Sequence, residues 1–63
     1  MSQAEESLKR AEELLEELET VRAQLEATED PEAAIDMLTE LSRIAKEVDV
    51  ELNRAKRAAD ADA

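Results

Sequence analysis

The side chains best able to do chemistry in this sequence are the carboxylates of its first half. Glu12, Glu13, Glu16, Glu17 and Glu19 crowd into about two turns if this segment is helical. Carboxylates at this spacing can bind a metal ion, transfer protons or present negative charge to a partner. One interpretation is a solvated helix face that keeps a small acidic protein in solution, and another is a patch complementary to a basic partner surface.

A carboxylate metal site is the third interpretation, and the residue types argue against it. Carboxylate metal sites in helical bundles add a His in a Glu-x-x-His motif, and the sequence contains no His. It contains no Cys either, which excludes thiolate zinc sites, disulfides and a Cys nucleophile. We therefore expect no catalytic residue, no metal and no cofactor.

Composition and charge exclude further classes of protein. The 63 residues include no Gly for a phosphate-binding loop and no aromatic residue on which a nucleic-acid base could stack. Eighteen acidic and eight basic side chains give a net charge of -10, which anionic membrane surfaces repel. The sequence therefore predicts a noncatalytic protein with no small-molecule substrate and no membrane interaction.

The basic residues are too few to bind nucleic acid directly. Their one cluster is Arg54, Lys56 and Arg57. At the end of a helix, these cations complement the negative end of the helix dipole. Binding to phosphates requires a larger basic surface, so we expect no direct contact with nucleic acid.

The first element that would carry these residues is a helix over about residues 3–28. Ser2 and Glu5 form a capping-box pattern at its start. Apolar residues then recur at spacings of four and three, as at the a and d positions of heptads. These residues are Ala4, Leu8, Ala11, Leu15, Leu18 and Leu25, with Leu14 and Val21 widening the stripe on one side.

The second element is a helix over about residues 31–58, followed by a frayed tail at 59–63. Its stripe contains Ala34, Leu38, Leu41, Ala45, Val48, Leu52, Ala55 and Ala59, again widened on one side by Met37 and Ile44. Asp30 suits the N-cap and Pro31 the first helical position, which predicts a turn at about 28–31. So short a turn predicts an antiparallel two-helix hairpin, an all-α fold that forms one domain over residues 1–63.

Such a hairpin presents more apolar surface than its two helices can cover. Small chains without disulfides or metals usually complete their core by association. We therefore expect completion by oligomerisation into a four-helix bundle or by helices of another protein. The predicted interface contains Leu8, Leu14, Leu15, Leu18, Val21, Leu25, Ile35, Met37, Leu38, Leu41, Ile44, Ala45, Val48 and Leu52.

Arg22 occupies an a position within the first apolar stripe. One interpretation is that its aliphatic stem packs while its guanidinium reaches water. The other is that Arg22 sets the register by pairing with a carboxylate of a partner.

The segment Leu15-Glu16-Glu17-Leu18-Glu19-Thr20-Val21-Arg22-Ala23-Gln24-Leu25-Glu26 resembles the first helix of the small subunit of exodeoxyribonuclease VII. Asp30-Pro31-Glu32-Ala33-Ala34-Ile35 and the later Ala45-Lys46-Glu47, Leu52 and Ala55 resemble its second helix. The resemblance covers about residues 11–56. The turn differs because it is shorter and lacks Gly, and Leu38 and Leu41 stand where the family often has an aromatic residue and Gly.

The resemblance implies a noncatalytic accessory subunit that binds the helical region of a large subunit, which carries the nuclease site and degrades single-stranded DNA. The alternative is a self-associating hairpin, natural or designed, whose dimer serves as a scaffold or adaptor. The first ten residues show no apolar export segment, so we expect a cytoplasmic protein.

Overall fold

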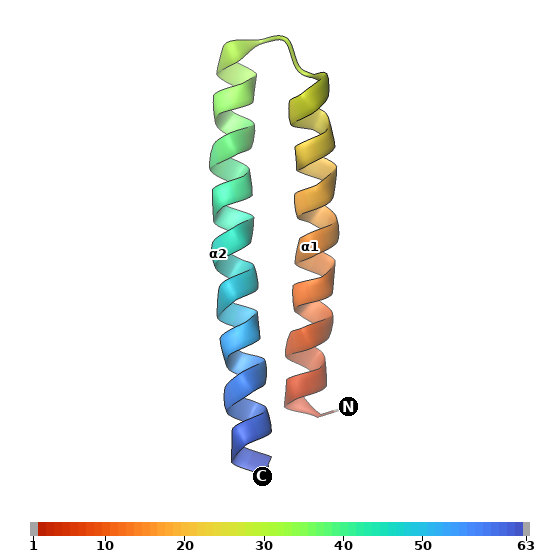
Figure 1. The fold of residues 1–63 in the computed structure, drawn as a ribbon, viewed down its shortest axis with the longest axis vertical. Helices are drawn as coiled ribbons and strands as arrows, with labels where there is room; N and C mark the ends of the chain where they lie inside the picture. Colours follow the sequence, from red (N-terminus) through yellow and green to blue (C-terminus); the bar gives the residue numbers. More distant parts are fainter. Residues whose placement is uncertain (1, 63) are drawn as a thin grey trace.

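The computed structural model describes residues 2–62, which form two antiparallel helices joined by a short turn (Figure 1). Helix α1 spans Gln3–Ala27 and helix α2 spans Pro31–Asp62. The helices lie side by side along a rod of 49 × 15 × 10 Å, with the turn at one end and both termini at the other. The prediction of an all-α helical hairpin is confirmed.

Helix α1 begins with the predicted cap. The backbone N–H of Glu5 donates to Ser2 Oγ at 3.1 Å, and the N–H of Glu6 donates to the Ser2 carbonyl at 3.0 Å. At the other end, Thr28 takes an extended conformation and its N–H donates to the Leu25 carbonyl at 3.3 Å. The chain therefore leaves α1 without a left-handed residue, so this turn does not require Gly.

Helix α2 starts where local signals place it. Asp30 Oδ1 accepts a hydrogen bond from the Glu32 N–H at 3.1 Å, and the Asp30 carbonyl accepts one from the Ala34 N–H at 2.9 Å. Pro31 occupies the first helical position, where its missing N–H costs no hydrogen bond. Asp30 is thus the N-cap, as its type and position predict.

Helix α2 continues to Asp62, beyond residue 58 where the sequence-based prediction ends it. Residues 59–62 of the predicted tail are thus helical in the structure, and Ala63 lies outside the described residues. Ala58, Ala59 and Ala61 are strong helix formers, and the segment contains neither Gly nor Pro to stop the helix. The last turns of α2 extend past the start of α1 (Figure 1).

The two helices meet along an interhelical seam with alternating spacings of three and four. Leu14 and Ile44, 1% and 0% exposed, are its largest fully buried side chains. The seam consists of Ser7, Ala11, Leu14, Leu18, Val21 and Leu25 from α1 and of Ala34, Met37, Leu41, Ile44, Val48, Glu51 and Ala55 from α2. Toward the termini it contains mainly small residues, so this end buries less apolar area than the middle.

Candidate protein interface

The structure divides the predicted interface between the interhelical seam and a second, exposed row. Leu14, Val21, Met37 and Ile44, which the sequence places at the border of each stripe, lie in the seam. Leu8, Leu15, Leu38 and Leu52, which the sequence places at its centre, are 46–54% exposed. The prediction is therefore wrong for this row of the stripe, because the seam uses the preceding residue at each of these four places. The other row of the stripe, which contains Leu18 and Leu41, lies in the seam.

The exposed residues gather on one side of the hairpin. Each directly follows a seam residue, as Leu15 follows Leu14 and Ala45 follows Ile44. Consecutive residues point about 100° apart around a helix. Because the two helices are antiparallel and face each other, the residues that follow seam residues point to the same side of the hairpin on both helices. We call this surface the open apolar face and define it as Leu8, Leu15, Leu38, Ala45 and Leu52.

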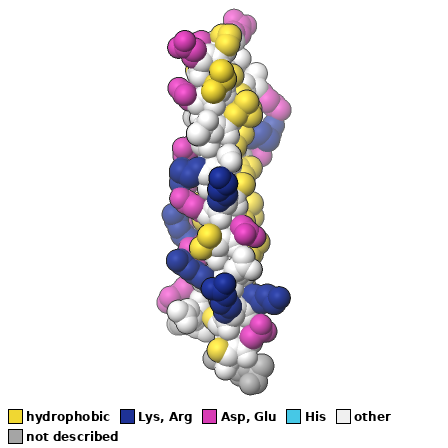
Figure 2. All heavy atoms as spheres, turned by 90° about the vertical axis from the view of Figure 1, so that its left-hand side faces the viewer, with side chains coloured by type: hydrophobic (Ala, Val, Ile, Leu, Met, Phe, Trp, Pro, Cys, Tyr) yellow, Lys and Arg dark blue, Asp and Glu magenta, His cyan; other side chains and the backbone are white. Residues whose placement is uncertain are grey.

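The ion pair between Glu17 and Arg43 shows that these two residues lie at the same height along the hairpin. Counting away from that pair in opposite directions along the antiparallel helices places Leu15 level with Ala45 and Leu8 level with Leu52. Half-buried seam residues form the floor between the two rows: Leu18, Leu25, Leu41 and Val48. Figure 2 shows hydrophobic side chains along one edge of the molecule when it is viewed from the side of α2.

The opposite side of the seam is polar. Arg43 Nη2 lies 3.2 Å from Glu17 Oε1 of α1, and Arg43 also pairs with Glu40 and, at 2.6 Å, with Glu47 on its own helix. Hydrogen bonding to Arg43 holds the pKa of the Glu40 carboxyl below its ordinary value and raises the pKa of Arg43. This side therefore satisfies much of its charge within the hairpin.

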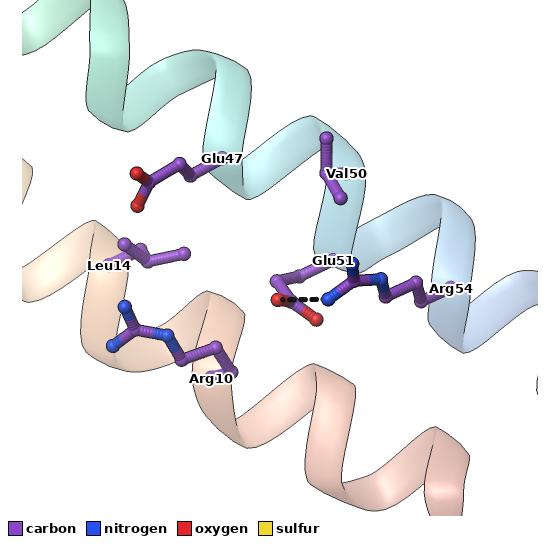
Figure 3. A pocket seen from close by; sticks show the side chains of 6 residues that line it. All are labelled: Arg10, Leu14, Glu47, Val50, Glu51 and Arg54. Carbon is purple, nitrogen blue, oxygen red and sulfur yellow. Dashed lines mark hydrogen bonds and ion pairs between the residues drawn. The ribbon is translucent and has the colours of Figure 1, made fainter.

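An open groove runs along this polar side, lined by Arg10, Leu14, Glu47, Val50, Glu51 and Arg54 (Figure 3). Arg54 Nη1 pairs with Glu51 Oε2 at 3.1 Å, and Arg10 lines the groove from α1. Side chains of both charge signs line it together, and the lining contains no hydroxyl, thiol or amine that could act as a nucleophile. We assign no substrate to it.

The carboxylates of the first half do not converge on a metal site. Among residues 2–62 no group of three or more Asp or Glu side chains is arranged to hold a metal ion. Glu13 instead lies 3.7 Å from Arg10, and Glu17 and Glu19 pair with Arg43 and Arg22. Several carboxylates of the cluster thus belong to the hairpin's own ion pairs.

Arg22 lies in the same helix row as Leu8 and Leu15, yet its guanidinium pairs within α1. It contacts the Glu19 carboxylate and lies 2.6 Å from Glu26 Oε1. Its hydrogen bonds to Glu19 hold the pKa of that carboxyl below its ordinary value. The Arg22 guanidinium is therefore already paired with carboxylates of its own helix, and its pairing with a carboxylate of a partner stays a prediction.

Three positions were missed by the sequence reasoning. Ser7 is buried and Glu51 is half-buried although both are polar, because the seam row passes through them. Val50 is exposed on the polar side, outside either heptad stripe. Ser7 lies seven residues before Leu14, and Glu51 lies seven residues after Ile44. Heptad spacing from these two residues would therefore have placed both in the seam.

Ile35, a predicted interface residue, is highly exposed one residue after the seam residue Ala34.

No family model, curated protein or solved structure matches this chain. No helix among the described residues is long and apolar enough to cross a membrane. The fold and its surface define a helical hairpin with a closed, ion-paired side and an open apolar side.

Proposed function

We propose that this chain is a noncatalytic subunit that packs its open apolar face against helices of a larger protein. The observation that carries the proposal is the exposure of Leu8, Leu15, Leu38 and Leu52 on one side of the hairpin. Exposed apolar surface of this kind, bordered by polar residues, is typical of protein interaction sites. An amphipathic helix of the partner would cover these leucines and complete the hydrophobic core that the two helices leave open.

The size of the face limits how it can bind. Full burial of a Leu side chain is worth about 1.5–3 kcal/mol, and these leucines are already about half buried, so covering four of them contributes about 3–6 kcal/mol. Association costs about 4–15 kcal/mol in lost translational and rotational freedom. Stable binding therefore requires a partner that also covers the floor and makes favourable contacts along the borders of the face.

Within this proposal, the partner is the helical region of a large nuclease subunit, as in exodeoxyribonuclease VII. The resemblance of Leu15–Glu26 and of the segment after Asp30 to that family's small subunit supports this assignment. The chain would then meet DNA only through its partner, because its own net charge is -10. We also place the chain in the cytoplasm, since a subunit of such a nuclease works where the DNA is.

A second copy of the chain is the alternative partner. The open apolar face runs over both helices, and two such faces packed together would form a four-helix bundle with a scaffold or adaptor role. Sedimentation equilibrium of the purified chain at micromolar concentration separates the two partners. A chain that binds a second copy should be a dimer, and a chain that binds another protein should be a monomer.

The decisive experiment is co-expression with the protein encoded by the neighbouring reading frame. We expect a large subunit with an OB-type N-terminal domain and a long helical region, and we expect it to co-purify with this chain. Failure of any such protein to co-purify, together with a stable dimer in sedimentation, would overturn the nuclease-subunit proposal.

Two matched substitutions test the surface itself. Leu52 and Val50 are both 47% exposed, but Leu52 belongs to the open apolar face and Val50 lines the groove on the polar side. Leu52→Gln should weaken co-purification several-fold, and its combination with Leu15→Gln should weaken it further. Val50→Gln should leave it unchanged, and equal losses in both variants would show that the wrong side has been chosen.

A further inference from the structure

The two borders of the open apolar face carry different charge. On α1 the border residues are those that follow Ala4 and the seam residues Ala11, Leu18 and Leu25. All four are acidic: Glu5, Glu12, Glu19 and Glu26. They recur every seven residues, so they line one edge along the whole helix. On α2 the corresponding border consists of Ile35, Ser42, Asp49 and Lys56, which has no net charge. All eight residues are exposed.

The acidic border is neutralised only at the end near the turn. Arg22 lies between Glu19 and Glu26 and pairs with both. At the corresponding places beside Glu5 and Glu12, the row of Arg22 contains Leu8 and Leu15 instead. Within residues 2–62, neither Glu5 nor Glu12 forms an ion pair in the hairpin. Covering the apolar face would therefore bring two carboxylates that no ion pair of the hairpin holds beside a partner.

We infer that the open apolar face binds an amphipathic helix of another protein that carries Lys or Arg at heptad spacing along the edge meeting α1. This inference rests on the proposed function and adds the chemistry of the partner. Charged residues that flank an apolar seam select partners and set their orientation, as they do in coiled coils. Glu5 and Glu12 are the residues that make the selection.

A second copy of the chain is a poorer occupant by the same criterion. If α1 packs against α1 of the copy, two borders of four acidic residues meet, which is unfavourable. If α1 packs against α2, its acidic border meets one Lys and one Asp, which gives no net attraction. Each copy also carries a net charge of -10, so long-range repulsion opposes their encounter.

Three labelled peptides of about 28 residues, monomeric at the concentrations used, provide the test. Each is an amphipathic helix with Leu at the a and d positions and with Lys, Gln or Glu at the flanking positions of one edge. Binding to the full chain is measured by fluorescence anisotropy at low and at high salt. We expect the Lys peptide to bind tightest, the Glu peptide weakest, and the preference for Lys to shrink at high salt.

Charge-neutral variants identify the carboxylates responsible. Glu5→Gln with Glu12→Gln removes two border charges, and Glu6→Gln with Glu16→Gln removes two exposed charges of α1 that lie outside this border. Both variants change the net charge equally, and both alter one residue in the first turn of α1. The first should weaken binding of the Lys peptide about 2- to 30-fold, the effect of losing two exposed ion pairs, and the second should not.

Other outcomes separate failure of this inference from failure of the proposed function. Equal affinity for the Lys and Glu peptides, with loss of binding in Leu15→Gln, would overturn the charge selection while leaving apolar docking intact. Failure of all three peptides to bind would count against docking on this face and so against both. A chain that dimerises more tightly than it binds the Lys peptide would assign the face to a second copy and overturn the inference.

Discussion

Arg43 on α2 lies 3.2 Å from the Glu17 carboxylate on α1, an ion pair that joins the two helices on the polar side of the hairpin. The same guanidinium also pairs with Glu40 and Glu47, so one side chain connects three carboxylates. It ties the helices together on the side away from the open apolar face. The pair therefore joins the two helices without occupying the surface that we propose for binding.

Loss of Arg43 should lower the stability of the hairpin more than loss of an intrahelical pair. Arg43→Gln removes the contact with α1 together with two pairs within α2, whereas Arg10→Gln removes an exposed pair with Glu13 on the same helix. These arginines, Glu17 and Glu13 are all exposed, so we expect a fall in Tm of a few degrees at most for Arg43→Gln and a smaller one for Arg10→Gln. Thermal unfolding followed by circular dichroism measures both, and an equal effect would contradict the bridging role.

The pairing of Glu40 with Arg43 should make stability depend on pH in a defined direction. The pKa of Glu40 is lowered in the folded chain, so the pair stabilises the fold above the ordinary carboxyl pKa. That stabilisation is lost as the pH falls through the lowered folded value. The difference in Tm between the wild type and Glu40→Gln should therefore be present at pH 7 and vanish in strong acid. A difference that does not change with pH would show that the effect is not ionic.

The adjacent leucines Leu14 and Leu15 should differ sharply in their effect on folding. Leu14 is 1% exposed and Leu15 is 50% exposed, although they are neighbours of the same type. Leu14→Ala should destabilise the hairpin by about 2–5 kcal/mol, because it leaves a cavity in the seam. A hairpin of this size has little more stability than that, so this variant should be largely unfolded at 25 °C.

Leu15→Ala is the matched control for the seam, and it should retain the helical circular dichroism of the wild type. Ile44→Val offers a milder probe, with an expected loss of about 0.5–1.5 kcal/mol in urea unfolding. If Leu15→Ala were more damaging than Leu14→Ala, the seam would run through the other row.

Removal of the Asp30 cap should destabilise α2 at its start. The Asp30 carboxylate accepts a hydrogen bond from the Glu32 N–H, which has no partner within the helix. Asp30→Ala should cost about 0.5–2 kcal/mol in the free energy of unfolding measured with urea. Glu29→Ala removes a neighbouring turn carboxylate that is not the N-cap, so it should change the unfolding energy by much less. Similar losses in both variants would argue that charge near the helix end matters rather than the cap.

Most of the fold could be predicted because its signals are local. The caps at Ser2 and Asp30 and the position of Pro31 depend on nearest neighbours, and the structure places them as predicted. The end of α2 was predicted less well, since the helix continues to Asp62 and no residue after 58 carries a stop signal. Association of the exposed row with a partner stays a prediction, because it depends on a molecule outside the chain.

The sequence by itself determined two amphipathic helices, their turn and an apolar stripe too wide for one contact, since heptad spacing and capping are encoded along a single chain. Only the tertiary structure decided which row of that stripe closes the hairpin. Rotating each helix about its axis by one residue would put Leu15 in the seam in place of Leu14 and Ala45 in place of Ile44. The apolar pattern of a single helix is compatible with either arrangement. The observed choice buries the large Ile44 against α1 and leaves the guanidinium of Arg22 in water beside Glu19 and Glu26. The opposite choice would turn Arg22 into the seam, where burying its charge is costly.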